Sequence, residues 1–398
     1  MPVNTSRRLF LAQASAAAMG EGKQKIVAVK AAPLRLLPAS RFGTKKFTSD
    51  YDPARFRWFG PFSQLTGAIL VRIRTDQGLT GYGMGGGGTA AVHIIEHHLQ
   101  DLLLGANALN VELLWEQMFA STSFYGRRGL PVMAISGIDL ALWDIAGQAA
   151  GVPVWRMLGG AVRERIPAYY TGSNFERAVK LGFRAFKMGM FEAGGGTDRE
   201  SMRRLIEALE RARSIVGAEA KLMLDCLCRW NVEHTLEFAR RAEHLNLYFI
   251  EEPLPPDDVV GYQRLCREVK GPRIACGEHE FTHYGFAEIL RNRAAQILQP
   301  DLTWGGGLST IRKVAEMGAR EGVPLLPHRG GSLFAIHLAA SHANCLMAES
   351  FGTGEGNEMM ERLTAPFENG YYLPPRKAGL GVELPEAVLR RHVPELAG

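Results

Sequence analysis

The sequence is poor in cysteine and shows no disulfide pattern. Only five cysteines occur among 398 residues, and an odd number cannot all pair within one chain. They lie in segments that we predict to be strands or helices, which indicates buried free thiols. The five are Cys226, Cys228, Cys266, Cys276 and Cys345. One residue separates Cys226 from Cys228, which is not the CxxC spacing of a zinc or redox site.

Long apolar runs and blocks of basic residues are also missing. No stretch of 18 apolar residues is present, so the body of the chain is not expected to span a membrane. The net charge of +5 is mild and favours anionic small molecules, whereas nucleic-acid binding would need a concentrated basic patch. The length leaves room for one large domain and a smaller second one.

Three short apolar runs each end abruptly on a carboxylate, at Asp225, Glu251 and Glu278. About 26 residues separate each acid from the next, which is the length of one strand, one helix and two short connections. The spacing therefore predicts three consecutive β/α units with one acid at the C-terminal end of each strand. In a parallel barrel these ends converge on one mouth, where such enzymes keep their chemistry.

The same rhythm extends over most of the C-terminal half. Apolar runs also lead into Lys187, Asp301, His328 and Glu349. Seven strand ends with polar groups predict a (β/α) barrel over residues 151–360.

The earlier part of the chain reads as strands followed by helices, which predicts an α+β capping domain over residues 23–150. Residues 361–398 lose the barrel rhythm, and we expect them to return to the cap. The fold class expected from these patterns is α/β, with a barrel under an α+β cap. The strands expected in the cap are 26–32, 68–73 and 79–83, and the helices are 90–104, 111–118 and 131–150.

Residues 1–22 are set apart by a twin-arginine pattern, Arg7-Arg8 followed by Leu9-Phe10-Leu11 and small apolar residues. One reading is an export signal to the periplasm; the other is an N-terminal extension on a cytoplasmic protein. The sequence leaves both localisations open.

A long segment without periodicity spans residues 38–63. Loops of that length in a compact domain are usually functional, often as lids. Its cationic and aromatic side chains include Arg55, Arg57 and Trp58, which suit closure over an anionic substrate. An ordinary charged surface loop explains them equally well.

The three strand-end acids suit one hard divalent cation. Carboxylates that meet without a cation repel one another, and three oxygen donors fit Mg²⁺ better than zinc, which prefers Cys and His. We therefore predict that Asp225, Glu251 and Glu278 bind Mg²⁺.

His328 and Asp301 occupy neighbouring strand ends, where a hydrogen bond would fix the imidazole tautomer and raise its basicity. We expect His328 to act as a general base and Lys187 to face an anionic group of the substrate. Glu349, if protonated in a shielded site, could donate a hydrogen bond to a developing oxyanion. Together these groups describe removal of a proton beside a carboxylate, with the enediolate stabilised by Mg²⁺.

From about Lys25 onward the chain resembles the mandelate racemase-like subgroup of the enolase superfamily, in its L-rhamnonate dehydratase branch. The resemblance is carried by Asp225-Cys226 with Trp230-Asn231-Val232, by Glu251 to Asp258, by Gly277 to Glu280, and by the cap segments 125–129 and 134–144. It implies a modified TIM barrel, (β/α)₇β, with Mg²⁺ on the three acids and His328–Asp301 as the proton-abstracting dyad. It also implies that Glu349 assists at the substrate carboxylate, that His279 borders the site, and that the protein is a homo-oligomer. The reaction implied is dehydration of an acid sugar to a 2-keto-3-deoxy acid.

Two departures limit the resemblance. The racemases have a second lysine two positions after the first, and this chain has Gly189 there, which favours one-sided chemistry such as dehydration. The rhamnonate enzymes have a histidine near the N-terminus, and this chain has none before His93, so the specific sugar stays open. Alternatives are epimerisation or cycloisomerisation through the same intermediate, or a catalytically silent homologue that binds a metal or ligand.

Overall fold

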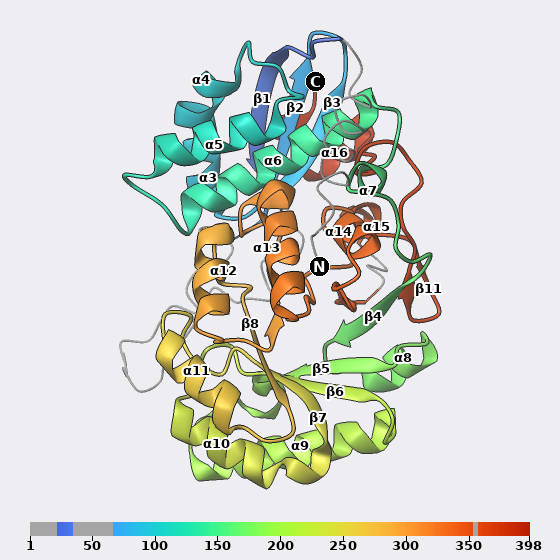
Figure 1. The fold of residues 1–398 in the computed structure, drawn as a ribbon. Helices are drawn as coiled ribbons and strands as arrows, with labels where there is room; N and C mark the ends of the chain where they lie inside the picture. Colours follow the sequence, from blue (N-terminus) through green and yellow to red (C-terminus); the bar gives the residue numbers. More distant parts are fainter. Residues whose placement is uncertain (1–21, 35–66, 353–356) are drawn as a thin grey trace, which may run out of the picture.

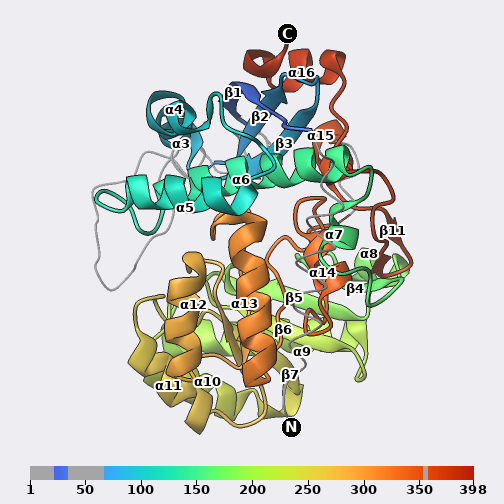
Figure 2. The same ribbon diagram turned by 45° about the horizontal axis from the view of Figure 1, so that its top comes forward.

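A computed structural model describes residues 22–34, 67–352 and 357–398 of the chain. The export-like segment and the predicted lid with Arg55, Arg57 and Trp58 lie outside these residues. The described chain is an α/β protein in which an α+β cap stands over the barrel (Figures 1 and 2).

The cap contains an antiparallel sheet in the order β1-β2-β3, formed by Ile26–Pro33, Ile69–Thr75 and Thr80–Gly85. Its helices are α3 (Gly88–Ile94), the π-helical η2 (Ile95–Leu99), α4 (Gln100–Leu103), α5 (Val111–Thr122) and α6 (Leu130–Ala149). The helix expected over 90–104 is therefore one helical segment whose middle turn is widened to a π-helix. The strands and the other two helices of the cap lie where the hydrophobic periodicity predicted them.

Among the described residues, only helix α6 is long and apolar enough to cross a membrane, and most of it is buried inside the molecule. It packs against β3 and against the barrel helix α13 (Gly307–Glu321). Glycine makes the contact with β3 possible, because a Cβ atom on Gly83 would lie 2.0 Å from the carbonyl oxygen of Gly137. Asp139 in the middle of α6 accepts a hydrogen bond from the backbone N–H of Ser309 at 3.0 Å, which ties the cap to the barrel.

The barrel is a ring of parallel strands that begins and ends at β4. Backbone bridges from Leu298 to Leu325 and from Leu325 to Cys345 continue the ring after β9, and β10 pairs with β4 to close it. The strands are β4 (Ile166–Thr171), β5 (Ala185–Gly189), β6 (Lys221–Asp225), β7 (Leu247–Glu251), β8 (Arg273–Cys276), β9 (Ile297–Leu298) and β10 (Ala348–Ser350).

Helices follow the strands around the outside of the barrel. Asp198 and Asn231 are N-caps of the helices that follow them, because their side chains accept hydrogen bonds from the backbone N–H groups of Ser201 and His234. The helices are α7 (Val154–Met157), α8 (Phe175–Lys180), α9 (Arg199–Val216), α10 (Val232–Arg241), α11 (Val259–Glu268), α12 (Thr282–Arg291), α13, α14 (Ile336–Ser341) and α15 (Glu358–Leu363).

The C-terminal segment divides between the two parts of the molecule. The short strands β11 (Phe367–Glu368) and β12 (Tyr371–Tyr372) extend the barrel sheet, with β12 antiparallel to β4. Helix α16 (Glu386–His392) then lies beside the cap sheet (Figure 1). Of residues 361–398, only the last part reaches the cap.

Inside the barrel, each strand contributes one buried apolar side chain to a common cluster. The cluster comprises Tyr169, Ala185, Met223, Phe249, Ala275, Ile297, Leu326 and Met347. Side chains on a strand alternate with a period of two, so the residue two positions later lies on the same face. Those later residues are Thr171, Lys187, Asp225, Glu251, Gly277, Gln299, His328 and Glu349. The apolar cluster therefore forms the floor under a layer of polar groups.

A buried histidine joins the barrel to its C-terminal extension. His337 Nδ1 accepts a hydrogen bond from the backbone N–H of Trp155, and His337 Nε2–H donates to the Leu380 carbonyl, each at 3.1 Å. Burial lowers the pKa of His337 from 6.5 to about 4, and a proton on Nδ1 would also oppose the N–H donor of Trp155. The folded state therefore requires the neutral imidazole.

This histidine predicts acid sensitivity of the fold. Because its folded pKa lies below its unfolded pKa, its contribution to stability is present above pH 6.5 and is lost as the pH falls towards 4. The loss amounts to about 3 kcal/mol. We expect His337→Gln, which can keep both hydrogen bonds but does not titrate, to lose less stability than the wild type between pH 7 and pH 4. Urea unfolding at both pH values measures this, and equal losses in the two proteins would contradict it.

Candidate functional site

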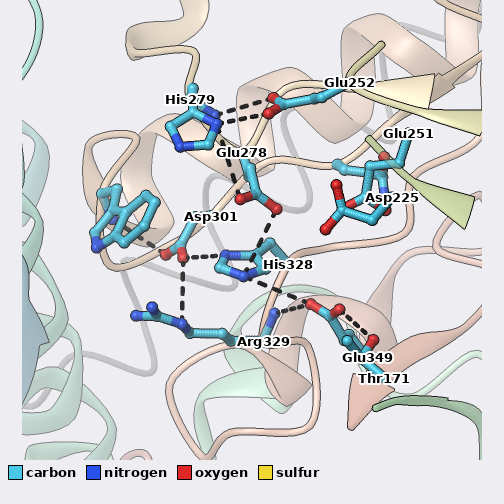
Figure 3. Close-up of polar contacts among 12 residues, drawn as sticks. Thr171, Asp225, Glu251, Glu252, Glu278, His279, Asp301, His328, Arg329 and Glu349 are labelled. Atoms are coloured by element: carbon cyan, nitrogen blue, oxygen red, sulfur yellow. Dashed lines mark hydrogen bonds and ion pairs between the residues drawn. The ribbon is translucent and has the colours of Figure 1, made fainter. Parts of the chain in front are cut away.

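The polar layer at the mouth of the barrel gathers most of the predicted site residues. Asp225 and Glu251 end adjacent strands and are paired in register. Glu278 is the second residue after β8, and the intervening Gly277 has φ +128° and turns the chain over the mouth. In Figure 3 the carboxylates of Asp225, Glu251 and Glu278 face a common space, with His328 across from them.

Burial and mutual repulsion destabilise the charged forms of these three carboxylates. Burial, the larger cause, and the neighbouring acids raise the pKa of Asp225 to about 7, of Glu251 to about 8 and of Glu278 to about 7. A divalent cation among them would relieve both effects, and three carboxylate oxygens are the donors that Mg²⁺ prefers. The donor set fits Mg²⁺ as the sequence predicted.

Lys187 belongs to the same polar layer, and its side chain is almost fully buried. Its ammonium is paired with Glu251, lies 2.8 Å from Glu349 Oε1 and is 4.0 Å from Asp225 Oδ2. Burial opposes the charge on Lys187, but these carboxylates hold its pKa well above the usual value. In this structure Lys187 is an internal counter-ion that links two strand-end acids, and its expected role at an anionic group of the substrate stays a prediction.

Both carboxyl oxygens of Glu349 accept hydrogen bonds, which favours the ionised form over the protonated form considered from the sequence. Oε1 accepts hydrogen bonds from the Thr171 hydroxyl at 2.6 Å and from the Lys187 ammonium. Oε2 accepts one from the backbone N–H of Arg329 at 2.9 Å. Burial would raise the pKa of Glu349, but Lys187 and His328 more than offset this and lower it to about 2. In this geometry Glu349 is a carboxylate and not a hydrogen-bond donor.

The expected contact between His328 and Asp301 is present. His328 Nδ1 lies 2.6 Å from Asp301 Oδ2 (Figure 3). Asp301 Oδ1 accepts hydrogen bonds from the backbone N–H and the hydroxyl of Thr303, both at 2.6 Å. Because the buried Asp301 carboxylate accepts this hydrogen bond, Nδ1 carries the imidazole proton. Nε2 is then directed at the mouth, 3.7 Å from Glu278 Oε2 and 3.8 Å from Glu349 Oε2.

The surrounding carboxylates make this imidazole strongly basic. Burial alone would lower its pKa, but Glu278, Glu349 and Asp301 raise the pKa of His328 to about 9. Of these carboxylates, Glu278 raises the pKa of His328 the most. A cation bound to Glu278 would offset that effect and lower the pKa of His328 towards neutral pH, where an imidazole works as a general base.

Arg329 was not singled out from the sequence, although it follows the predicted base directly. Its guanidinium lies over the Trp304 ring, 4.8 Å from the centroid, and its Nε is 4.0 Å from Asp301 Oδ2. About a third of the side chain is exposed, so it offers the mouth a fixed positive charge.

Glu252 was quoted only as part of a motif, yet it holds His279 in place. Its Oε2 lies 2.6 Å from His279 Nδ1, and both residues are drawn together in Figure 3. Coulombic attraction by Glu252 outweighs burial and raises the pKa of His279 to about 10. Glu251 and Glu252 are consecutive at one strand end, so their side chains point to opposite faces of the strand. That alternation in the sequence could have shown that Glu252 serves a different group from Glu251.

Gln299 was missed as well. Its side-chain amide donates to Glu251 Oε2 inside the polar layer. Its position two residues after the buried Ile297 could have identified it as a member of the polar layer.

The comparisons with known proteins agree with this geometry. Residues 63–159 match the mandelate racemase/muconate lactonizing enzyme N-terminal domain, and residues 171–388 match the enolase C-terminal domain-like family. A curated protein from Caldivirga maquilingensis, provisionally named L-rhamnonate dehydratase, is 33% identical over 86% of each chain.

Two solved structures show the same fold. Rhamnonate dehydratase from Gibberella zeae complexed with Mg aligns with a TM-score of 0.81 and 30% identity, covering 94% of this chain and 97% of that one. The 3,6-anhydro-D-galactonate cycloisomerase from Zobellia galactanivorans aligns with a TM-score of 0.76 and 28% identity, covering 92% of this chain and 99% of that one.

Proposed function

Because this chain belongs to the mandelate racemase/muconate lactonizing enzyme family of the enolase superfamily, we propose that it is a Mg²⁺-dependent acid-sugar dehydratase. The substrate class is a sugar acid with both a hydrogen and a hydroxyl on the carbon beside the carboxylate, and a second hydroxyl on the next carbon. The product is a 2-keto-3-deoxy acid. The observation that carries the proposal is the imidazole–carboxylate pair facing three strand-end acids across one mouth.

The proposed metal ligands are Asp225, Glu251 and Glu278. Bound there, Mg²⁺ would supply the positive charge that makes the hydrogen beside a carboxylate acidic enough for imidazole to remove. Lys187 pairs with Glu251 inside the barrel, so its ammonium orients this acid and favours its ionised form against the effect of burial. The protein's contribution is therefore a rigid set of charged oxygens whose own repulsion favours a cation.

His328 is the proposed base. Asp301 holds Nδ1–H, so the free Nε2 takes the α-proton of the substrate. The resulting imidazolium then returns this proton to the hydroxyl on the neighbouring carbon, which departs as water with the C–O electron pair while the carbon–carbon double bond forms. The enol product tautomerises to the keto acid. Glu349 and Arg329 border the same side of the mouth, and the guanidinium suits a substrate oxygen or carboxylate.

One-sided chemistry is the reason to prefer dehydration over racemisation. Gly189, at the end of β5, has no side chain to serve as a second base opposite His328. A single imidazole can abstract a proton and deliver it to a leaving hydroxyl on the same face. It cannot deliver a proton to the opposite face of the carbon.

A screen of aldonic and aldaric acids with the Mg²⁺-loaded protein tests the proposal, and L-rhamnonate belongs in the first set. We expect at least one acid to give a 2-keto-3-deoxy product, detected as its semicarbazone, and protein stripped of metal with EDTA to give none. Proton NMR of the same reactions identifies any epimer or cyclic isomer. A product without a carbonyl group would replace dehydration by epimerisation or cycloisomerisation, and absence of turnover on every acid would oppose an enzymatic role.

A further inference from the structure

A second group of potential metal ligands lies behind the three predicted magnesium ligands. Cys228, Glu252 and His279 each offer one ligand atom, and the three atoms lie within 4.8 Å of one another. Cys228 and Glu252 are buried, and the His279 side chain is only 17% exposed. A thiol, a carboxylate and an imidazole are a different donor set from the three carboxylates at the mouth.

Hydrogen bonds already direct the three groups at one another. Glu252 Oε2 accepts from the Cys228 thiol at 3.1 Å and lies 2.6 Å from His279 Nδ1. Glu252 Oε1 faces the backbone N–H groups of Gly277 and His279 at 3.3 and 3.4 Å. One carboxylate oxygen is therefore held by the backbone, and the other joins the thiol to the imidazole.

The backbone is strained where it holds these three groups together. Leu227, Cys228 and Glu252 have φ values of 51°, 57° and 38°, in the left-handed region that side-chain-bearing residues rarely adopt. The Cys228 N–H donates to the Glu252 carbonyl at 2.6 Å, which ties the two strained turns together. Strain at two neighbouring strand ends that meet at one polar cluster is typical of a functional constraint.

We propose that Cys228, Glu252 and His279 form a second metal site, for a soft divalent transition ion of the zinc type. Thiolate and imidazole are the ligands that such ions prefer over Mg²⁺. The ion replaces two protons, one from the Cys228 thiol and one from His279 Nδ1, and both are released to solvent. Its bonds to sulfur, nitrogen and oxygen form with no change of oxidation state.

The two distances from Glu252 Oε2 are close to those required, and the thiol and imidazole ligand atoms lie within 4.8 Å of each other. Tetrahedral zinc holds sulfur at about 2.3 Å and nitrogen or oxygen at about 2.0 Å, which separates its ligand atoms by roughly 3.3 to 3.5 Å. The hydrogen-bonded atoms would move apart by well under about 1 Å to admit the ion. Glu278 Oε1 lies 3.8 Å from His279 Nδ1. Glu278, or a water molecule bound to it, could therefore supply the fourth ligand.

Zinc binding in saturating Mg²⁺ tests the site directly. We expect the wild-type protein to bind one Zn²⁺ per chain in a calorimetric titration, and Cys228→Ser to bind it at least about 100-fold more weakly. Cys345→Ser is the matched control, because it removes another buried thiol and leaves the cluster intact. It should bind Zn²⁺ as the wild type does.

Cobalt provides a readout that does not depend on activity. Co²⁺ in the wild-type protein should give a thiolate-to-metal charge-transfer band in the near ultraviolet, which Cys345→Ser keeps and Cys228→Ser loses. Equal zinc affinity in Cys228→Ser and the wild type, or cobalt without the thiolate band, would overturn the proposal. The first outcome would assign zinc to the carboxylates at the mouth, and neither outcome bears on the dehydratase reaction.

Discussion

His328→Asn is expected to lower kcat for acid-sugar dehydration by about 10²- to 10⁴-fold, the range for losing a general base. Asparagine keeps a polar group near Asp301 but cannot accept the substrate proton at neutral pH. Asp301→Asn should also reduce kcat, because the amide no longer holds the proton on Nδ1 and the imidazole loses its assigned tautomer. Steady-state kinetics with the acid found in the substrate screen measure both effects.

A histidine away from the mouth provides the control for this prediction. His244 is about half exposed and pairs with Glu210 on the outside of the barrel, so His244→Asn should leave kcat unchanged. Circular dichroism and Mg²⁺ titration show whether His328→Asn keeps the fold and the metal site. A folded, Mg²⁺-binding His328→Asn variant with wild-type kcat would exclude this histidine as the base.

Lys187→Met is expected to cost about 3–5 kcal/mol of unfolding free energy in the absence of Mg²⁺. Methionine fills nearly the same volume, so the loss comes from charge and not from a cavity. Without the ammonium, Glu251 and Glu349 remain buried next to each other with no internal counter-ion. Saturating Mg²⁺ should restore part of the loss, because a cation near Glu251 replaces some of the missing positive charge. Urea unfolding with and without Mg²⁺ measures both quantities.

The matched control makes the same substitution at an exposed ion pair. Lys377 pairs with Glu383, and each side chain is 62% exposed. Lys377→Met should therefore change the stability by less than about 1 kcal/mol, with or without Mg²⁺. If Lys187→Met were equally mild, the buried ammonium would not be the counter-ion that its contacts indicate.

Much of the site could be predicted because strands impose a simple order on the sequence. A residue that ends an apolar run in a parallel barrel must lie at the mouth, so Asp225, Glu251 and His328 could be placed together without coordinates. Asp198 and Asn231 could be assigned as caps because their side chains bond to N–H groups only three residues away. In both cases a local pattern determines the geometry.

The roles of Lys187 and Glu349 could not be read in the same way. Both lie at strand ends, on β5 and β10, which flank β4. Lys187 Nζ therefore lies 2.8 Å from Glu349 Oε1, and the chemistry of each residue depends on the other although they are far apart in sequence. The pKa of a buried group follows from its neighbours, and strand spacing does not identify them. Strand spacing therefore placed Lys187 and Glu349 at the mouth but did not show that the two residues pair with each other.

The sequence by itself determined the barrel, its cap and the identity of the acids and the histidine at the mouth, because these follow from hydrophobic period and from residue type. Only the tertiary structure decided which of these groups are paired, which are charged, and that Cys228, Glu252 and His279 converge behind them. The physical reason is that electrostatic and coordinate interactions act over a few ångströms between strands and loops distant in sequence. Distances of that kind exist only after the ring has closed.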